Sequence, residues 1–493
     1  MRDRGVSSCR ERDAPLPPPS AAVPLPLQGR INDRTPRLTR LLALLAAAFL
    51  LRGLVLGDPV IHVDEEFYFV TARAIARGSL PYIDVWDRKP FGLFLLYLPA
   101  AALPWRWGIV AYQLMAFASA LATAWLIARL ADRAGWQRGA TLAGIAYLVW
   151  LDLLGGVGGQ SPVFYNLLVV GGATLALRPG LLRAAAAMAL IGLALQIKYS
   201  ALFEGIALGL WLLWLNWRSL PASAAHAALL IALALAPTVA AWGFYAAHGH
   251  ADAFNYANFT SIFARHPDPW PEQLGNAATL LLILSPLIAM AFGATRDADA
   301  PLVRRFLRGW FGVALVAVAL FGSWFDHYGL PVLVPACACA AGFFANSRWR
   351  RLTPAVLALA AIIGLARVVI DREHRGNGVQ LAALARAIGR GPGCLFVYSG
   401  STMLYPATGR CAASTYIFPS HLSRSREARA IGVDQAAEVR RILATRPAAI
   451  VMRPPYRGER PAIRALVTAE VHNSYRLAAR LPMGRETLEV WRR

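Results

Sequence analysis

Leu41 to Leu56 reads LLALLAAAFLLRGLVL, and a polar turn, Gly57-Asp58-Pro59, follows it. A run of this kind is close to the length that crosses a hydrocarbon core about 30 Å thick. Apolar runs of about 15 to 25 residues recur up to Ile370, with short polar breaks between them. The pattern predicts a membrane domain that occupies most of the chain. A cleaved signal peptide is the alternative for the first run, but an unusually long segment precedes it.

The composition excludes an ordinary soluble protein. Of 493 residues, 57% are hydrophobic and only 16% are charged, which is far from the mixture found in soluble domains. The net charge of +22 raises nucleic acid as a partner. The arginines, however, fall in alternate loops between apolar runs instead of gathering on one soluble face. We therefore expect a membrane protein that does not bind nucleic acid.

Basic loops alternate with loops that contain no Lys or Arg, and this alternation predicts the orientation. Short loops rich in Lys and Arg stay on the cytoplasmic side of a membrane. The loops around Gly155 to Ser161 and Trp324 to Tyr328 have neither residue, so we place them outside. The basic loops, placed inside with the N-terminus, are Arg129 to Arg138, Arg178 to Arg183, Arg218, Arg296 to Arg308 and Arg348 to Arg351. This assignment of loops to the two sides requires an odd number of membrane spans, about eleven, and it places the C-terminal part outside.

Composition divides the chain into three regions. Residues 1–40, rich in Pro and Arg, predict a disordered cytoplasmic tail, residues 41–370 a transmembrane domain, and residues 371–493 a small extracytoplasmic α/β domain. The long outer loop 58–107 contains two helix-compatible segments, Asp64 to Arg77 and Phe91 to Leu103. We expect both of these helices to lie along the membrane surface.

The third region is expected to form a small sheet covered by helices. The predicted strands are Cys394 to Tyr398, Ala448 to Met452, Arg476 to Leu481 and Thr487 to Trp491, and the predicted helices are Val379 to Ile388, Val433 to Ala444 and Ala462 to Glu470. Cys394 and Cys411 would lie in an oxidising compartment, where they either form a disulfide or remain free. No cysteine spacing in the chain is typical of a metal site.

Three adjacent acids, in Asp64-Glu65-Glu66-Phe67-Tyr68, stand directly outside the first span. Adjacent carboxylates at a membrane surface repel one another, so they require a counter-charge or a function. The alternative is structural: Asp64 would cap the helix that begins there, with Glu65 and Glu66 at the positive end of its dipole.

The same loop supplies cations near these acids. It continues with Gly78-Ser79-Leu80-Pro81-Tyr82-Ile83-Asp84 and then with Asp87-Arg88-Lys89-Pro90-Phe91. Arg88 and Lys89 are either interfacial anchors or ligands of a phosphate-bearing lipid. Lys and Arg are usually more frequent in cytoplasmic loops, so their position in an outer loop favours the role of phosphate ligands. Glycosyl transfer from a lipid phosphate needs such a pair of features, a carboxylate to take the acceptor's proton and positive charge to stabilise the departing phosphate.

The order of these motifs resembles that of a known family. The chain has D-E-x-x-Y after a first span, then G-x-x-P-Y-x-D, and then K-P before a short apolar helix. This order is similar to that of the membrane glycosyltransferases related to dolichyl-phosphate-mannose protein mannosyltransferases. Their relatives include the bacterial aminoarabinose and galacturonosyl transferases of lipopolysaccharide. Gly192-Leu193-Ala194 with Lys198, and His327-Tyr328 with Pro335, are similar to two further family segments. The resemblance covers about Arg37 to Phe344.

The resemblance implies a GT-C fold in a bacterial inner membrane and a polyprenyl-phosphate sugar donor. The acceptor would be a lipid, glycan or protein outside, and transfer would invert the anomeric centre. Asp64 would be the base, Glu65 its neighbour and Lys89 the ligand of the lipid phosphate. The substrate-binding residues would be Tyr68, Tyr82, Asp87, Arg88, Lys89, Lys198, His327 and Tyr328.

Several of these residues have structural alternatives. Lys198 either faces the carrier phosphate or pairs with Glu204 in a membrane-embedded hairpin. His327 either covers the donor site or belongs to a hydrogen-bonded turn. Arg265 and His266, in a later outer loop, are interpreted as solvated residues rather than phosphate ligands.

The sequence also departs from the family pattern. Many relatives carry a second acid in the next outer loop, where this chain has only Gln160 and Asn166 as polar candidates beside Ser161. The missing acid argues against a two-carboxylate metal site. The need for a divalent cation stays open, because only Asp64, Glu65, Glu66 and Asp87 could supply oxygen ligands. The alternatives to an enzyme are a transporter or lipid flippase, which should have internal repeats or interrupted helices, and an assembly protein that recruits partners.

Overall fold

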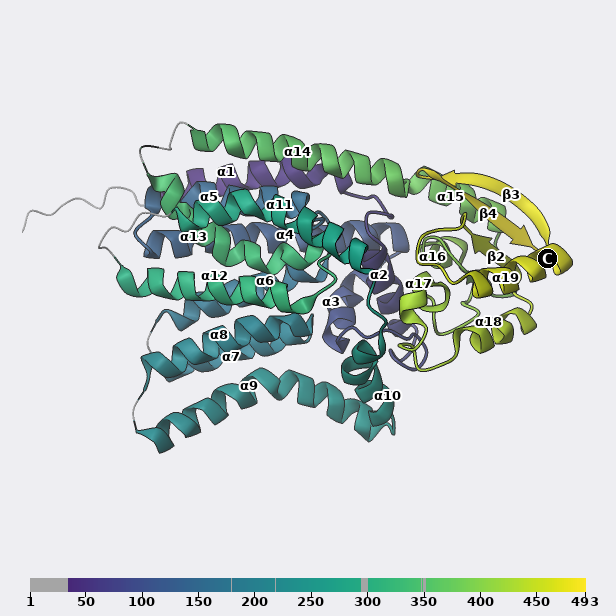
Figure 1. Ribbon diagram of the computed structural model, residues 1–493, viewed down its shortest axis with the longest axis horizontal. Helices are drawn as coiled ribbons and strands as arrows, with labels where there is room; N and C mark the ends of the chain where they lie inside the picture. The colour runs from purple at the N-terminus through teal and green to yellow at the C-terminus, as the bar shows by residue number, and fades with distance from the viewer. Residues whose placement is uncertain (1–33, 179, 218, 294–299, 347, 349–351) are drawn as a thin grey trace, which may run out of the picture.

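The computed structural model describes residues 34–178, 180–217, 219–293, 300–346, 348 and 352–493. A long helical bundle carries a small mixed domain at one end (Figure 1). Residues 1–33 of the predicted tail lie outside the described residues, as do Arg218, 296–299 and 349–351 of the predicted basic loops. The first helix begins at Arg34, so the last part of the predicted tail is helical.

The bundle consists of helices that run roughly parallel to the long axis (Figure 1). They are α1 (Arg34–Arg52), α4 (Trp105–Arg133), α5 (Gln137–Leu153), α6 (Ser161–Ala176), α7 (Leu181–Leu195), α8 (Leu202–Leu215), α9 (Leu220–Ala247), α11 (Trp270–Phe292), α12 (Pro301–Phe321), α13 (Leu333–Ala345) and α14 (Leu352–Arg375). Six helical stretches of the described chain are long and apolar enough to cross a membrane, and four shorter apolar helices accompany them. The number of crossings stays a prediction.

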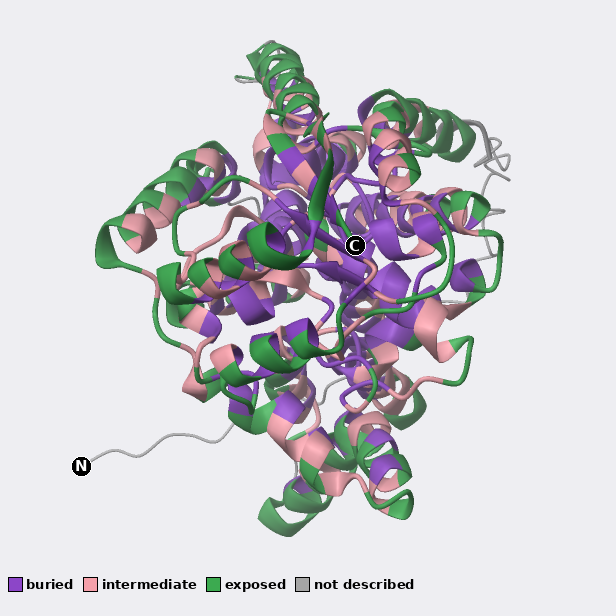
Figure 2. Ribbon diagram, turned by 90° about the vertical axis from the view of Figure 1, so that its right-hand side faces the viewer, coloured by how far each residue is buried: buried purple, intermediate pink, exposed green. Residues whose placement is uncertain are grey.

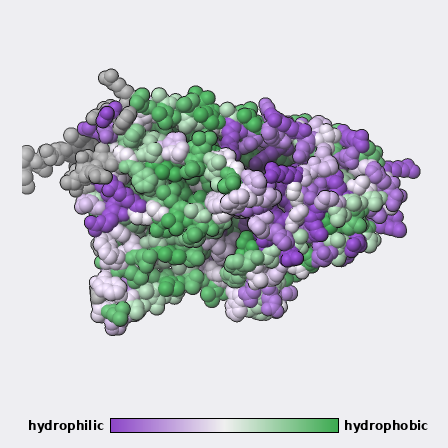
Figure 3. Space-filling view, in the orientation of Figure 1, coloured by the Kyte–Doolittle hydropathy of each residue, from purple (hydrophilic) through white to green (hydrophobic). Residues whose placement is uncertain are grey.

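The surface of the bundle has the polarity that a lipid environment requires. Hydrophobic side chains cover its flanks, whereas hydrophilic side chains cover much of the C-terminal domain (Figure 3). Small residues allow the central helices to approach closely. A Cβ added at Gly139 of α5 would lie 2.0 Å from the carbonyl oxygen of Ala341 in α13. The polarity and the packing are those of a multi-pass membrane protein.

The first outer loop contains the two helices expected from the sequence. They are α2 (Val63–Ile75) and α3 (Phe91–Ala101), and they lie between the bundle and the C-terminal domain (Figure 1). Acids occupy the first turn of α2, where they favour the positive end of the helix dipole. Gly78, with φ of +94°, follows the end of α2, and Pro90 directly precedes α3 and sets its start.

Three short helices lie between α9 and α11, and one further short helix precedes α13. They are α10 (Ala251–Asn255), η3 (Tyr256–Thr260), η4 (Ser261–Ala264) and η5 (Asp326–Val332). The stretch that leads into α13 begins as a 3-10 helix at Asp326. Pro331 lies within η5, and because proline lacks the backbone N–H, the regular helix α13 starts only at Leu333.

The C-terminal domain contains the four strands that the sequence predicted. They are β1 (Leu395–Val397), β2 (Ala449–Met452), β3 (Arg476–Met483) and β4 (Glu486–Arg492), in the order β1-β2-β4-β3, with β1 and β2 parallel and the other pairs antiparallel. The helices are α15 (Gly378–Ile388), α16 (Leu404–Thr408), α17 (Pro419–Ser423), η6 (Ser425–Glu427), α18 (Gln435–Ala444) and α19 (Pro461–Ser474). A disulfide joins Cys394 to Cys411. Viewed from this domain, buried residues fill the centre of the molecule (Figure 2).

Candidate functional site

The acids that open α2 have very different exposure. The side chain of Asp64 is 19% exposed, whereas Glu65 is fully buried and Glu66 is only 4% exposed. The N-cap of α2 is His62, whose Nδ1 accepts the backbone N–H of Asp64 at 3.2 Å. The capping role proposed for Asp64 was therefore wrong, because His62 performs it. Of the three carboxylates, the one of Asp64 is left open to a ligand.

Lys89 controls the charge of Asp64. Burial by itself would raise the pKa of the Asp64 carboxyl, but the Lys89 ammonium outweighs burial, with help from His62 and His327, and holds the pKa well below its usual range. The amide Nε2 of Gln160 also donates to Asp64 Oδ2 at 3.4 Å. The carboxylate is therefore ionised at neutral pH.

Two lysines stand over tyrosine rings at this site. Lys89 Nζ lies 5.7 Å from the ring centre of Tyr68, and Lys198 Nζ lies 5.0 Å from that of Tyr328. The aromatic face attracts each ammonium and fixes its position without neutralising it. Burial, followed by repulsion from Lys89, lowers the pKa of Lys198 to about 8, in the loop between α7 and α8. The two ammonium groups therefore form one positive region beside Asp64.

Lys198 is attracted electrostatically by both Asp64 and Glu204. Glu204 lies in the first turn of α8, and no ion pair joins it to Lys198 among the described residues. The local pair that sequence reasoning considered is therefore absent there. Attraction to Asp64, and then to Glu204, raises the pKa of Lys198 and partly opposes the effects of burial and Lys89.

His327 belongs both to a turn and to the site. Its Nδ1 lies 3.3 Å from Asp326 Oδ1, and Arg367 of α14 forms an ion pair with the other oxygen of Asp326. Its ring also meets the ring of His62 edge-on, with centres 5.9 Å apart. His327 therefore does belong to a hydrogen-bonded turn. The same turn places His327 close enough to lower the pKa of Asp64, and it places the ring of Tyr328 against Lys198.

Tyr82 holds the backbone that carries Lys89. Its hydroxyl donates to the Lys89 carbonyl at 2.8 Å. The same hydroxyl lies 3.4 Å from Asn258 Oδ1, which also accepts the Tyr199 hydroxyl at 3.0 Å. Tyr82 adopts φ of +69°, an uncommon conformation for a residue with a side chain, which its buried contacts stabilise. Tyr82 is thus positioned to orient Lys89.

Glu65 packs against the glycine-rich loop after α5. A Cβ at Gly158 would lie 2.1 Å from Glu65 Oε2. Arg52, at the end of α1, donates to the carbonyls of Gly156 and Gly158 at 2.7 and 2.9 Å and fixes this loop. Burial raises the pKa of Glu65 to about 7, although the N–H of Gly159 partly opposes that rise. Glu65 therefore supports the start of α2 from the bundle side.

The C-terminal domain reaches the same loop through ionic contacts. Arg88 Nη2 donates to Glu427 Oε2 at 2.7 Å, and Arg265 lies 3.1 Å from the other oxygen of Glu427. Asp87 Oδ1 accepts the Arg88 N–H at 2.7 Å and lies 3.9 Å from His421 Nε2. Arg265 is therefore ion-paired, contrary to the expectation of a solvated residue, whereas His266 is exposed.

The predicted residues thus divide into two groups. Asp64, Lys89, Lys198 and His327 interact electrostatically with one another, the rings of Tyr68 and Tyr328 contact the two lysines, and Tyr82 and Glu65 support the segments that carry Lys89 and Asp64. Asp87 and Arg88 face the C-terminal domain instead. Sequence reasoning missed Glu427 and the buried Asn258, because only the three-dimensional structure brings them close. Gln160, which stands in the loop where many relatives carry an acid, donates to Asp64 Oδ2.

The four carboxylates that were considered as metal ligands, those of Asp64, Glu65, Glu66 and Asp87, point to different partners and not to a common point. Asp64 faces Lys89, Glu65 faces Gly158, Glu66 accepts the Ser401 hydroxyl at 2.5 Å, and Asp87 accepts the Arg88 N–H. Within the described residues, no three His, Cys, Asp or Glu side chains form a group that could hold a metal ion.

Comparison with known proteins identifies the fold. No family model and no curated protein sequence matches the chain. The crystal structure of ArnT from Cupriavidus metallidurans bound to undecaprenyl phosphate matches with a TM-score of 0.64 and 16% identity, covering 93% of this chain and 98% of that one. The apo structure of the same protein matches with a TM-score of 0.62 and 15% identity over 92% and 98% of the two chains. The GT-C-like fold expected from the sequence is therefore confirmed.

Proposed function

We propose that this protein is a membrane glycosyltransferase that moves a sugar from a polyprenyl-phosphate carrier to a lipid, glycan or protein acceptor. The observation that carries the proposal is the ionised, accessible Asp64 beside Lys89 and Lys198. A base and a phosphate-binding charge are the two parts that this reaction needs. The fold shared with ArnT, which has been crystallised with undecaprenyl phosphate, adds support.

In this mechanism, Asp64 is the general base. The acceptor hydroxyl gives its proton to the Asp64 carboxylate while its oxygen forms a bond to the anomeric carbon. The bond between that carbon and the phosphate oxygen breaks on the opposite face, and the carrier phosphate leaves with the electron pair. The anomeric configuration is inverted because a single displacement occurs.

Lys89 and Lys198 have two roles in the proposal. They bind the donor phosphate and stabilise the negative charge that develops on it as it leaves. Tyr68 and Tyr328 hold the two ammonium groups in place through their ring faces. Tyr82, Asp87 and Arg88 orient the loop that carries Lys89.

Donor binding also changes the strength of the base. In the free protein, Lys89 holds the pKa of Asp64 low, which makes the carboxylate a weak base. A bound phosphate partly neutralises the Lys89 ammonium, so the pKa of Asp64 rises toward the range in which a base is effective. Asp64 therefore becomes a better base only when the donor is present.

The proposal includes a location and a domain division. The protein would lie in a bacterial inner membrane with its N-terminus in the cytoplasm and residues 371–493 in the periplasm. The membrane domain 41–370 would hold the donor, and the site would face the periplasm between that domain and the C-terminal one. Support comes from the basic loops of the sequence and from helices that suit a membrane by length and composition.

The test uses Asp64→Asn and Lys89→Ala in membranes supplied with undecaprenyl-phosphate-linked sugars, with mass spectrometry of the envelope glycans. Asp64→Asn should lower the transfer rate by about 10²–10⁴-fold, and Lys89→Ala by about 10²–10³-fold. Asp252→Asn is the control, because this exposed acid lies outside the site. Transfer at the wild-type rate in both folded site variants would refute the site assignment. A wild-type protein that transfers no sugar from any lipid-linked donor would refute the function.

A further inference from the structure

A second polar hollow lies where α2 meets the C-terminal domain, and the proposed reaction does not use it. It is a groove of about 350 Å³, a size suited to a lipid headgroup. We call it the arginine groove. Its lining includes Val70, Arg73 and Arg77 on one side, and Tyr405, Arg410 and Cys411 on the other.

The arginine groove is on the opposite side of α2 from Asp64. Arg73 follows Asp64 by nine residues, which corresponds to about half a turn around the helix axis and about 13 Å along it. Glu66, on the same side of α2 as Arg73, contacts Ser401 of the C-terminal domain. The groove is therefore a separate feature of the domain junction.

The positive charge of the groove has no local counter-charge. The pocket lining contains no acidic residue, and within the described chain none of Arg73, Arg77 and Arg410 forms an ion pair. Arg410 donates instead to backbone carbonyls, those of Gly389, Gly391, Pro392 and Gly393. Neutral carbonyls fix a guanidinium but leave its charge uncompensated.

Arg73 has both a fixed position and an unused donor. Its Nη1 donates to the carbonyls of Ala101 and Leu103 at 3.0 and 2.7 Å, while its buried Nε has no partner. Burial and the nearby Arg77 lower the pKa of Arg73, which indicates that the two guanidinium groups repel each other. An anion between them would relieve that repulsion.

The groove lies near the start of a candidate membrane span. Leu103, whose carbonyl binds Arg73, is two residues before α4, and Trp107 in the first turn of α4 is 69% exposed. Exposed tryptophans at span ends favour the headgroup region. The arginine groove is therefore at the depth where lipid phosphates occur.

We propose that the arginine groove binds the phosphate of an anionic lipid from the leaflet next to the C-terminal domain. Arginine suits this ligand because its planar guanidinium group donates two parallel hydrogen bonds to phosphate oxygens. The bound lipid would hold α2 against the C-terminal domain. The inference concerns a binding site and does not depend on the proposed transferase activity.

The test measures lipid binding to the full-length protein in a neutral detergent by microscale thermophoresis. The probes are dioctanoyl phosphatidylglycerol, its phosphatidylcholine counterpart and inorganic phosphate. The variant is Arg77→Gln, because Arg77 is exposed and its loss should not disturb folding. Arg73→Gln is avoided, since Arg73 also holds the end of α3. Arg476→Gln is the matched control, because Arg476 is an exposed arginine on β3 outside the groove.

Wild type and Arg476→Gln should bind phosphatidylglycerol about fivefold or more tightly than phosphatidylcholine, and Arg77→Gln should lose about fivefold in affinity for phosphatidylglycerol alone. Equal affinity of wild type and Arg77→Gln for phosphatidylglycerol would overturn the site. An equal loss in Arg476→Gln would also overturn it, because the binding would then reflect overall charge. Inorganic phosphate that binds as tightly as the lipid would overturn the assignment to a lipid and identify free phosphate as the ligand.

Discussion

At the scale of single residues, three consecutive acids have three separate environments. Lys89 lowers the pKa of Asp64, whereas burial raises those of Glu65 and Glu66 to about 7. The sequence places all three in one helical turn, and their different surroundings come from different elements of the fold. A single turn can therefore combine an ionised carboxylate with two that carry a proton at mildly acidic pH.

Glu66 should make stability depend on pH. Its pKa of about 7 in the folded protein exceeds the ordinary value of 4.5, so the folded state retains a proton that the unfolded chain has released. The stability from this proton is complete below pH 4.5 and is lost as the pH rises through about 7. We expect Glu66→Gln, which mimics the protonated form, to flatten the fall of the melting temperature between pH 5 and 8.

The measurement is thermal unfolding of the detergent-solubilised protein at several pH values. The Gln side chain retains an oxygen that can accept the Ser401 hydroxyl, so the contact with the C-terminal domain should persist. Asp252→Asn serves as the control and should keep the wild-type slope. If Glu66→Gln keeps that slope as well, the pH dependence does not come from Glu66.

At the scale of elements, sequence patterns predicted most of the helices and strands. Proline and glycine marked the boundaries of α2 and α3, and short strand-like runs between helical patterns predicted the strands β1 to β4. The 3-10 start at Asp326 was missed, because hydropathy does not distinguish it from the helix that follows. The contact between Glu65 and the glycine loop was also missed, since Gly158 is far from α2 in the sequence.

Gly158→Ala should disturb the site through Glu65. The added Cβ would lie 2.1 Å from Glu65 Oε2, and Arg52 holds the loop so that it has little freedom to withdraw. Such overpacking costs about 1–3 kcal/mol and should move the start of α2, including Asp64. We expect a melting temperature lower by a few degrees and a reduced rate of sugar transfer.

Gly243→Ala is the matched control for this prediction. Gly243 lies inside α9, and an added Cβ there meets no atom within 4 Å. Alanine in a helix interior is more stable than glycine by about 0.5–1 kcal/mol, so this variant should be neutral or slightly stabilised. Equal behaviour of the two variants would show that the Gly158 contact has no special role.

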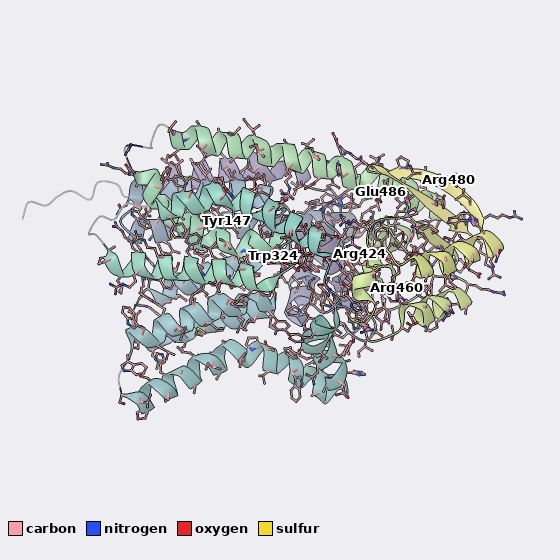
Figure 4. All side chains as sticks on the ribbon, viewed as in Figure 1. Tyr147, Trp324, Arg424, Arg460, Arg480 and Glu486 are labelled. Carbon is pink, nitrogen blue, oxygen red and sulfur yellow. A yellow bond between two sulfur atoms is a disulfide. The ribbon has the colours of Figure 1, made fainter. Side chains whose placement is uncertain are left out.

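At the scale of the whole molecule, the C-terminal domain and the first outer loop form one ionic junction. Sequence reasoning placed both on the same side of the membrane, yet it did not connect them. Ion pairs across a fold depend on rotamers and loop paths that hydropathy and spacing do not specify. Figure 4 labels Trp324 and Arg424 near the junction, while Arg480 lies farther out on the domain.

Glu427 should be the electrostatic centre of this junction. Its buried carboxylate pairs with Arg88, Arg265 and Arg426 at 2.7, 3.1 and 3.6 Å. Burial would raise the pKa of Glu427, but Arg88 and Arg265 outweigh burial and lower it to about 2, so the group remains charged. Glu427→Gln would leave the partly buried guanidinium groups of Arg88 and Arg265 without this counter-charge, whereas Arg426 keeps Asp268. Breaking a buried pair costs about 3–5 kcal/mol, and these partly buried pairs should cost less.

Hydrogen–deuterium exchange should locate the effect of Glu427→Gln in two loops. Residues 82–90 and 261–268 carry Arg88 and Arg265, so their amides should exchange faster, while those of β2 and β4 should keep their protection. Glu489→Gln is the control, since it removes an exposed ion pair with Arg480, and exposed pairs contribute about 0–1 kcal/mol. Unchanged exchange in both loops would mean that packing alone joins the domain to the bundle. Faster exchange there, with an intact sheet, would mean that one carboxylate of the C-terminal domain holds the loop that carries Lys89.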